Sequence, residues 1–370
     1  MNRKLKCQLL LLALTMQAQS MEDIKPITVK FDGFKTANPF FELKKAKKCL
    51  QNEYRIGKIC MKNNIPTNSV VNLVIPARTQ NGHKVTLDKR ACSGLNNENI
   101  KINLFLSKRR KPHQKYCDYV KIVGDKSGFF QGSSSLVSID MRGVDAKEGK
   151  WLKGGWKQNS IRNKHSMTRM FEGCTSLKSI KWGNFNTRKV TRMDYMFKDC
   201  KNLKNLNLNR FNTSMVRTMR EMCANCYKLE HFDMSLCNVS KVQNMEGMFL
   251  NCKSLPYVNL KNYDMRNVQT IANMFEGSES MQSIKFPVSD VQKLTTIQSL
   301  SQNCTQLKNL DLSGIQIPSS TNMTDFISGC QSLDNVSFHI NMSTGKAINA
   351  VNQSTDHPNL AIEELITEIK

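Results

Sequence analysis

Apolar residues recur along the chain at a spacing of 26 residues. Each repeat opens with Met or Ile, and three residues later comes a second apolar column that starts with Met170. The next column is cysteine, with Ser278 in its place in the fifth copy, and Leu- and Ile-rich columns follow. Seven copies keep this frame without an insertion; they begin at Met167, Met193, Met219, Met245, Ile271, Ile297 and Met323. Such a period predicts a stacked repeat architecture.

Each copy combines two apolar periods. Spacings of three and four residues in 193–203 predict one or two helical turns. Leu206 and Leu208 then alternate with polar residues, which predicts a short strand with both leucines facing the core. Because one unit cannot bury both faces alone, the pattern predicts a right-handed α/β solenoid with a parallel sheet on one face.

The repeat also sets the expected domain limits. Residues 130–141 align with 171–182 as an interrupted eighth copy, and we expect the extra residues between them to project as a loop. The solenoid is therefore expected over 127–342. Further on, Ile362, Leu365, Ile366 and Ile369 fall at helical spacing, and this predicts a capping segment with an amphipathic helix in 343–370.

The first 20 residues are typical of a signal peptide. A basic start precedes the apolar stretch 9–14, and small residues stand at Ala18 and Ser20. No apolar run is long enough to span a bilayer, so we expect no membrane span and a secreted or cell-surface protein. The remaining segment, 21–126, is expected to be a small basic module, β-rich in character.

The frame Met-x-x-Met-Phe-x-x-Cys-x-x-Leu-x-x-Leu-x-Leu-x-x-Phe-Asn-Thr, read from Met193 to Thr213, resembles the BspA-like leucine-rich repeat surface proteins. The resemblance covers 127–342 and implies a leucine-rich-repeat-like fold. It also implies a secreted or surface-exposed protein that adheres to host or microbial surfaces, and a role in recognition rather than catalysis. Upstream, 70–76 together with 81–85 weakly resembles a second repeat type of such proteins.

Charge changes this picture by adding a second class of ligand. The chain carries a net charge of +24, and 21–126 alone holds 22 Lys and Arg against nine Asp and Glu. Such a surplus suits polyanions, such as acidic polysaccharides. We rank nucleic acid lower, because few aromatic residues accompany the basic ones. The candidate polyanion-binding residues are Lys44, Lys45, Lys47, Lys48, Lys108, Arg109, Arg110 and Lys111.

Two further regions are candidate ligand sites. In the inserted loop, Trp151 and Trp156 stand beside Lys150 and Lys153, a mixture that suits a sugar ring or a protein hot spot. The alternative is that both indoles fold back onto the solenoid. On the sheet, outward positions need not pack and are free either to bind a ligand or simply to be solvated. These candidates are Lys181, Asn205, Asn207, His231, Asp233, Tyr257 and Asn259.

The cysteines divide into two groups. We expect those of the repeat column to be free thiols packed in the core. Cys49, Cys60, Cys92 and Cys117 lie in the presumed exported module, where an even number of cysteines predicts two disulfides with the pairing left open. Cys223 and Cys226 have metal-ligand spacing, but no second pair completes a zinc site. We therefore predict no metal, no cofactor and no catalytic residue.

The sequence as a whole favours a recognition or adhesion protein. Its predicted partner is an extracellular surface protein or glycan of a host or microbe, bound by the sheet face and the basic module. One alternative is a polyanion binder that acts through charge alone, and its binding would collapse with modest salt. A second alternative is an enzyme with its site in the N-terminal module, which would require clustered acid and base groups in a cleft.

Overall fold

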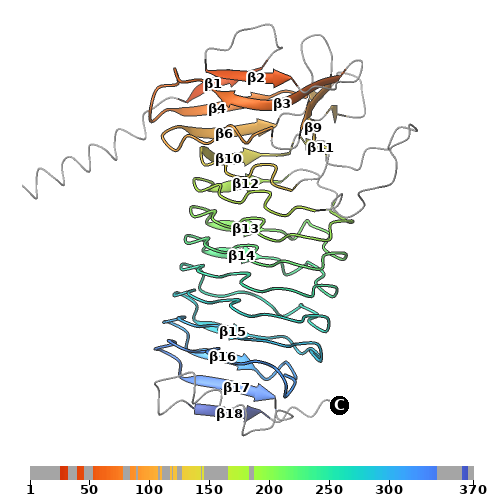
Figure 1. Ribbon diagram of the computed structural model, residues 1–370, viewed down its shortest axis with the longest axis vertical. Coiled ribbons are helices and arrows are strands. Elements are labelled where there is room, and N and C mark those ends of the chain that lie inside the picture. Colours follow the sequence, from red (N-terminus) through yellow and green to blue (C-terminus); the bar gives the residue numbers. More distant parts are fainter. Residues whose placement is uncertain are drawn as a thin grey trace, which may run out of the picture.

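The structure is a computed structural model, and its description extends to most of the repeat region. The residues described are 26–31, 40–45, 53–77, 84–88, 91–106, 109–110, 117–118, 120–122, 127–142, 144–145, 166–182, 187–339 and 361–365. Within these residues the chain forms strands and turns and no helix. The repeats stack one below another along the long axis of the molecule (Figure 1). We refer to this arrangement as the coil stack.

Short strands line one face of the stack, one in every coil of the described repeats except that of Pro256, and they pair in parallel. The pairs β13 with β14, β15 with β16, and β16 with β17 all join residues exactly one repeat apart, as in the pairing of Leu206 with Phe232. The strands are β12 (Ser179–Lys181), β13 (Asn205–Asn207), β14 (His231–Asp233), β15 (Ser283–Lys285), β16 (Asn309–Leu312) and β17 (Asn335–His339). The predicted strands and parallel sheet are therefore confirmed.

The N-terminal strands lead into the first repeat through β12. One five-stranded parallel sheet has the order β1-β4-β6-β10-β12, so it runs from the predicted module into the repeats. Its further members are β1 (Ile27–Lys30), β4 (Val70–Ile75), β6 (Lys101–Leu106) and β10 (Leu136–Asp140). A second sheet contains β2 (Phe41–Lys45), β3 (Glu53–Met61), β5 (Lys84–Leu87), β9 (Val120–Ile122) and β11 (Val144–Asp145), and a two-stranded ribbon pairs β7 (Arg109–Arg110) with β8 (Cys117–Asp118).

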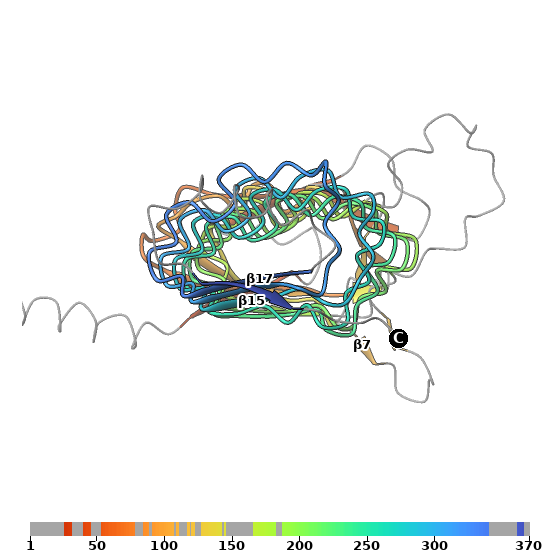
Figure 2. The same ribbon diagram turned by 90° about the horizontal axis from the view of Figure 1, so that it is seen from below.

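The face opposite the sheet is also held together from coil to coil. Parallel bridges link Ser166 to Arg192 and continue at every repeat down to Asn322. Within each coil, alternate backbone N–H groups of this face donate hydrogen bonds to carbonyl groups of the next coil. Tyr195 N, for example, donates to Arg220 O at 2.9 Å. Viewed along the axis, the coils superpose, with β15 and β17 on the same side (Figure 2).

The helical turns expected in 193–203 are absent, and the expectation was wrong. Tyr195 and Asp199 both have positive φ, and every copy repeats these two left-handed positions. A right-handed helix cannot contain such residues at a spacing of four, because they reverse the direction of the chain. The segment instead forms two successive turns, with Met196 N bonded to Met193 O at 3.3 Å and Cys200 N to Phe197 O at 3.0 Å.

Residues 361–365 of the expected C-terminal helix form a strand instead, and the rest of that segment, 366–370, lies outside the described residues. β18 (Ala361–Leu365) pairs in parallel with β17, with Ile362 opposite Val336. The backbone of Ile362 and Leu365 therefore follows the register of the stack rather than a helix. The right-handed sense of the coil and its leucine-rich-repeat kinship stay predictions.

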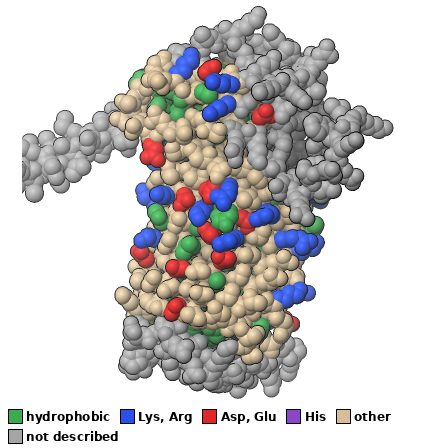
Figure 3. Space-filling view, in the orientation of Figure 1, with side chains coloured by type: hydrophobic (Ala, Val, Ile, Leu, Met, Phe, Trp, Pro, Cys, Tyr) green, Lys and Arg blue, Asp and Glu red, His purple; other side chains and the backbone are tan. Residues whose placement is uncertain are grey.

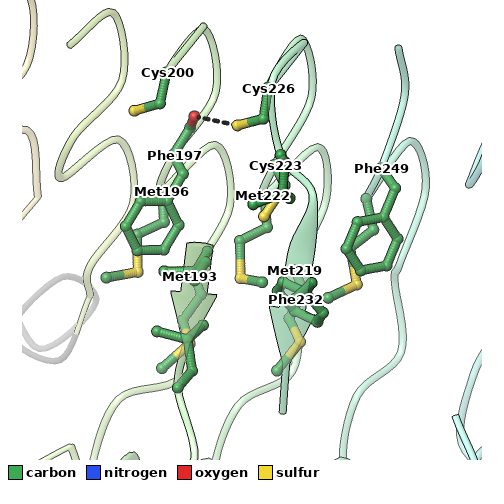
Figure 4. Close-up of a cluster of buried hydrophobic side chains, with 14 of the residues drawn as sticks. Met193, Met196, Phe197, Cys200, Met219, Met222, Cys223, Cys226, Phe232 and Phe249 are labelled. Carbon is green, nitrogen blue, oxygen red and sulfur yellow. Dashed lines mark hydrogen bonds between the residues drawn. The ribbon is translucent and has the colours of Figure 1, made fainter. Parts of the chain in front are cut away.

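The core consists of columns of identical or similar side chains. Phe130, Phe171 and Phe197 stack with ring centroids 5.0 and 5.3 Å apart. Beside them runs the cysteine column, in which each thiol donates to a backbone carbonyl of the preceding coil. Cys226 Sγ, for example, lies 3.2 Å from Phe197 O (Figure 4). Ser278 takes over this bond to Phe249 O at 2.8 Å, so the hydroxyl reproduces the function of the thiol.

Candidate ligand-binding face

The outward positions of the strands form two columns on the sheet face. The outer column holds the first outward residue of each coil, namely Ser179, Asn205, His231, Tyr257, Ser283, Asn309 and Asn335. The capping column lies two residues later and holds Lys181, Asn207, Asp233, Asn259, Lys285, Asp311 and Ser337. Where strands pair, equivalent residues of neighbouring coils are directly opposite, about 4.8 Å apart. Each column is therefore a nearly linear array along the stack.

The capping column has a structural task. Asn207, Asp233, Asn259 and Asp311 each accept a hydrogen bond from the N–H two residues ahead, at 3.0–3.1 Å. This is an Asx turn, and it bends the chain out of the strand into the next segment. The Asx turns thus explain why Asn or Asp stands at the candidate positions 207, 233 and 259 without any ligand.

Asp233 is the most strongly held of these side chains. Its carboxylate accepts hydrogen bonds from the N–H and hydroxyl of Ser235, and from the amides of Asn207 and Asn209 at 3.0 and 2.6 Å. The bonds from Ser235 first, and then that from Asn209, lower the pKa of Asp233. The carboxylate is therefore ionised at neutral pH and fully used inside the protein.

The outer column has no such task. In the described part of the chain, no intramolecular hydrogen bond engages the side chains of Asn205, His231 or Tyr257, and all three are exposed. Ser283 and Asn309 are exposed in the same way. Tyr257 is 60 % exposed, which is high for an aromatic residue on a sheet. This column therefore presents hydrogen-bonding groups and one aromatic ring to a ligand.

Tyr257 stands where the sheet is interrupted. Glu230 and Gln282, one repeat before and one after Pro256, donate their N–H groups to the carbonyls of Lys204 and Pro256 at 2.9 and 3.0 Å. Pro256 has no N–H to donate, and its coil forms no strand between β14 and β15. The aromatic residue of the outer column thus lies at the single coil of 187–339 that departs from the regular sheet.

The other candidates lie elsewhere. Trp151, Trp156, Lys150, Lys153, Lys47, Lys48, Lys108 and Lys111 lie outside the described residues, so both readings of the loop remain predictions. Lys44 is exposed in β2 with its ammonium 4.0 Å from the Glu42 carboxylate, and Lys45 follows it in the strand. Arg109 and Arg110 form β7. Lys181 is exposed at the N-terminal end of the sheet face.

The prediction of two disulfides in the N-terminal module was wrong. Cys60 and Cys92 are both free. Two disulfides would need all four cysteines of the module, so the two free ones exclude every pairing of all four. Cys92 is fully buried, and its carbonyl accepts a bond from the Ser133 hydroxyl at 2.9 Å, as the carbonyls beside the cysteine column do. Cys49 lies outside the described residues, and Cys117 lies in β8.

The cysteines of the repeat column are free and buried, as predicted. Burial raises the pKa of Cys330 to about 11 and that of Cys174 to about 12. Such thiols stay protonated at neutral pH and are poor nucleophiles or metal ligands. Within the described chain, no group of three or more His, Cys, Asp or Glu is placed to hold a metal ion.

A second polar cluster, which the sequence patterns did not predict, lies on the face opposite the sheet. Arg169 lies over the Tyr195 ring at 4.4 Å and pairs with Glu172. Lys198 pairs with Glu221, and Arg220 pairs with Glu246 at 2.9 Å. Basic and acidic side chains also lie interleaved in the middle of the view of Figure 3. These charges recur near 26-residue spacing, a signal that was available in the sequence. Because they neutralise one another, they do not attract a charged ligand.

Charge is distributed unevenly along the stack. Residues 1–228 contain 45 Lys and Arg against 16 Asp and Glu, whereas 229–370 contain nine against 14. Because the described coils follow one another in sequence order (Figure 1), those before residue 229 carry an excess of basic residues and those after it do not. No helix of the described chain is long and apolar enough to cross a membrane.

Comparison with known proteins adds a family match without a function. A family described as "Mycoplasma protein of unknown function, DUF285" matches residues 165–286 and 235–340. No curated protein matches. A solved structure of a leucine-rich repeat protein from Bacteroides ovatus aligns over 90 % of this chain and 100 % of its own, with 14 % identity and a TM-score of 0.26. A likeness at that score is too weak to support an argument about fold or function.

Proposed function

We propose that this chain is a secreted or surface-exposed recognition protein that binds a protein or glycan through its sheet face. The observation that carries the proposal is the contrast between the two columns of that face. Four capping-column residues make Asx turns, whereas the outer-column residues from Ser179 to Asn309 are exposed and make no side-chain hydrogen bond within the described chain. Repeat proteins use such extended surfaces for binding, because side chains that do not pack are free to vary.

Tyr257 is the predicted centre of this surface. Its ring is 60 % exposed, and His231 and Ser283 flank it in the neighbouring coils of the outer column. An exposed tyrosine among polar residues is typical of a binding hot spot, since its ring is large and rigid and its hydroxyl also bonds. Surface location and adhesion are part of the proposal, supported by the leader-like segment 1–20 and by the family resemblance.

The test is binding of the chain that begins at Met21 to arrays of glycans and extracellular proteins at physiological salt. We expect a ligand whose binding weakens about tenfold in Tyr257→Ala. Val288→Ala is the matched control, because Val288 is 85 % exposed and lies outside both columns. Retained binding in Tyr257→Ala, with an intact fold by circular dichroism, would contradict the proposal for this face.

The basic N-terminal segment supports a second function, charge-driven binding of polyanions. The observation that supports this function is the basic excess of 21–126, which holds 22 Lys and Arg against nine Asp and Glu. Such binding falls steeply with salt and is insensitive to Tyr257. Measuring each ligand at about 50 and 200 mM salt therefore separates the two functions.

A further inference from the structure

The carboxylates of the sheet face are mostly bound within the protein. They make charged pairs of 2.6–2.8 Å or, in Asp233, the four hydrogen bonds described above. The pairs are Asp140 with Arg142, Glu230 with Lys204, and Asp311 with Lys285. Among the carboxylates of this face whose side chains the structure describes, Asp334 is the exception, and Glu363, opposite Ser337, is outside that set. The acidic charge of the face is thus largely cancelled before any ligand arrives.

Its cations are not cancelled in the same way. Four exposed basic residues at or next to the two columns have no carboxylate within ion-pairing distance in the described part of the chain. They are Lys178, Lys181, Lys261 and Lys308. Lys178 and Lys308 occupy the same repeat position five coils apart, which places them about 24 Å apart along the stack at 4.8 Å per coil. Cations without an ion-pair partner therefore lie on this face on both sides of Tyr257 along the axis, although Asp140 stands opposite Lys181 in the neighbouring strand.

The same face lacks an apolar centre. The large hydrophobic side chains exposed in the described residues are Met215, Leu236, Tyr257 and Val288, and only Tyr257 belongs to the two columns. Protein partners usually require a well-packed apolar core in the interface. The face instead offers amides, hydroxyls and an imidazole around one ring. This composition favours a ligand that is itself hydrophilic and contains rings.

We propose that the sheet face binds an acidic glycan lying along the axis of the coil stack. Tyr257 stacks on one sugar ring, and Asn205 and His231 bond to hydroxyl groups on neighbouring rings. Lys178 and Lys308 bind carboxylate or sulfate groups toward the two ends of the bound segment. This assignment rests on the proposed function and names its ligand class. It also places the glycan on the repeat face rather than on the basic N-terminal segment.

The experiment is calorimetric titration of the chain beginning at Met21 with acidic oligosaccharides of increasing length, at physiological salt. The probes are oligogalacturonate, hyaluronan and heparin fragments, together with neutral galactan and polyglutamate of similar length. We expect affinity for at least one acidic glycan to rise with length until about 24 Å is covered and then to level off. Neutral galactan and polyglutamate are expected to bind at least tenfold more weakly, because each lacks one of the two recognised features.

Two variants locate the site. Tyr257→Ala and the double variant Lys178→Gln/Lys181→Gln are each expected to weaken binding about tenfold. Lys201→Gln/Lys241→Gln makes the same change of charge away from the two columns and is expected to leave affinity unchanged. Circular dichroism of each variant establishes that the fold is retained.

The outcomes separate this inference from the proposed function. Equal binding of polyglutamate, or equal losses of affinity in both double variants, would overturn the proposal of an acidic glycan. Binding would then depend on charge only. Tyr257-dependent binding of a protein or a neutral glycan, with no acidic glycan bound, would overturn the inference while the proposed function stands. If no ligand of any class depends on Tyr257, both are wrong.

Discussion

The packing around Cys223 provides the sharpest test of how the coils share their core. In the column that holds Phe171, Phe197, Phe249 and Phe275, the third coil has Cys223 instead of a ring. The same coil has Phe232 in the strand column, where the other coils have Ile, Leu or Val. The Phe232 ring meets Phe249 edge-on, with centroids 4.7 Å apart and planes at 79° (Figure 4). We infer that the aromatic ring has moved from one column to the other.

The perturbation is therefore a double exchange, Cys223→Phe with Phe232→Leu. Phe232→Leu alone loses the edge-on aromatic pair, worth about 0.5–1.5 kcal/mol. With the gap left in the core, its total cost is expected to reach about 2–3 kcal/mol. Cys223→Phe alone adds a ring to a filled core and is expected to cost about 1–3 kcal/mol. Together, the changes restore a continuous stack at the spacing of 5.3–5.6 Å seen between neighbouring rings.

The assay is urea denaturation of all four proteins, followed by far-ultraviolet circular dichroism. We expect the double variant to lie within about 1 kcal/mol of the parent, so the two changes couple by about 2 kcal/mol or more. Leu206→Phe is the control, because it adds a strand ring to a coil that already has Phe197. It should destabilise the protein without rescue. Simple additivity of the two single changes would refute the idea that one ring replaces the other.

Three further outcomes follow from single side chains. Because hydrogen bonds lower the pKa of Asp233, its contribution to stability is present above the ordinary range near pH 4 and is lost as the pH falls further. In Asp233→Asn, the free energy of unfolding measured with urea should therefore depend less on pH between about pH 4 and 2. An unchanged slope would contradict this. Ser278→Ala should lower the free energy of unfolding by about 1 kcal/mol, whereas Ser278→Cys, which restores the column residue, should be nearly neutral by the same assay. Gly277→Ala should lower the melting temperature more than Gly132→Ala does. Both glycines have positive φ, but a Cβ at Gly277 would lie 2.2 Å from an amide oxygen, whereas nothing lies within 4 Å of a Cβ at Gly132. Equal losses of melting temperature would be evidence against that clash.

The helix prediction failed although its correction was present in the sequence. The position before the column cysteine holds Gly173, Asp199, Asn225, Asn251 and Gly277, and these are residue types that tolerate the left-handed region. Apolar spacing of three and four residues also arises when two tight turns follow one another. The polar residues between the apolar ones therefore carried the information that distinguishes a helix from paired turns.

The candidate site was only half predictable for a related reason. Alternation along the strand identified both Asn205 and Asn207 as outward, but it could not distinguish them. The distinction depends on where the chain turns after β13, since Asn207 lies two residues before a backbone N–H that needs an acceptor, and Asn205 does not. The balance of free cations over paired carboxylates likewise depends on which side chains meet across coils, as Lys204 and Glu230 do at 2.8 Å.

By itself, the sequence determined the period, the number of regular coils and the side chains that form the core columns. These follow from a 26-residue repeat of apolar residues, because burying such residues requires identical units to stack in register. Only the tertiary structure decided that the turns are not helices, that residues 361–365 form a strand, and that the thiols bond to carbonyls of the preceding coil. Those outcomes depend on contacts between coils, where backbone groups of one repeat find partners in the next, and no pattern within a single repeat contains them.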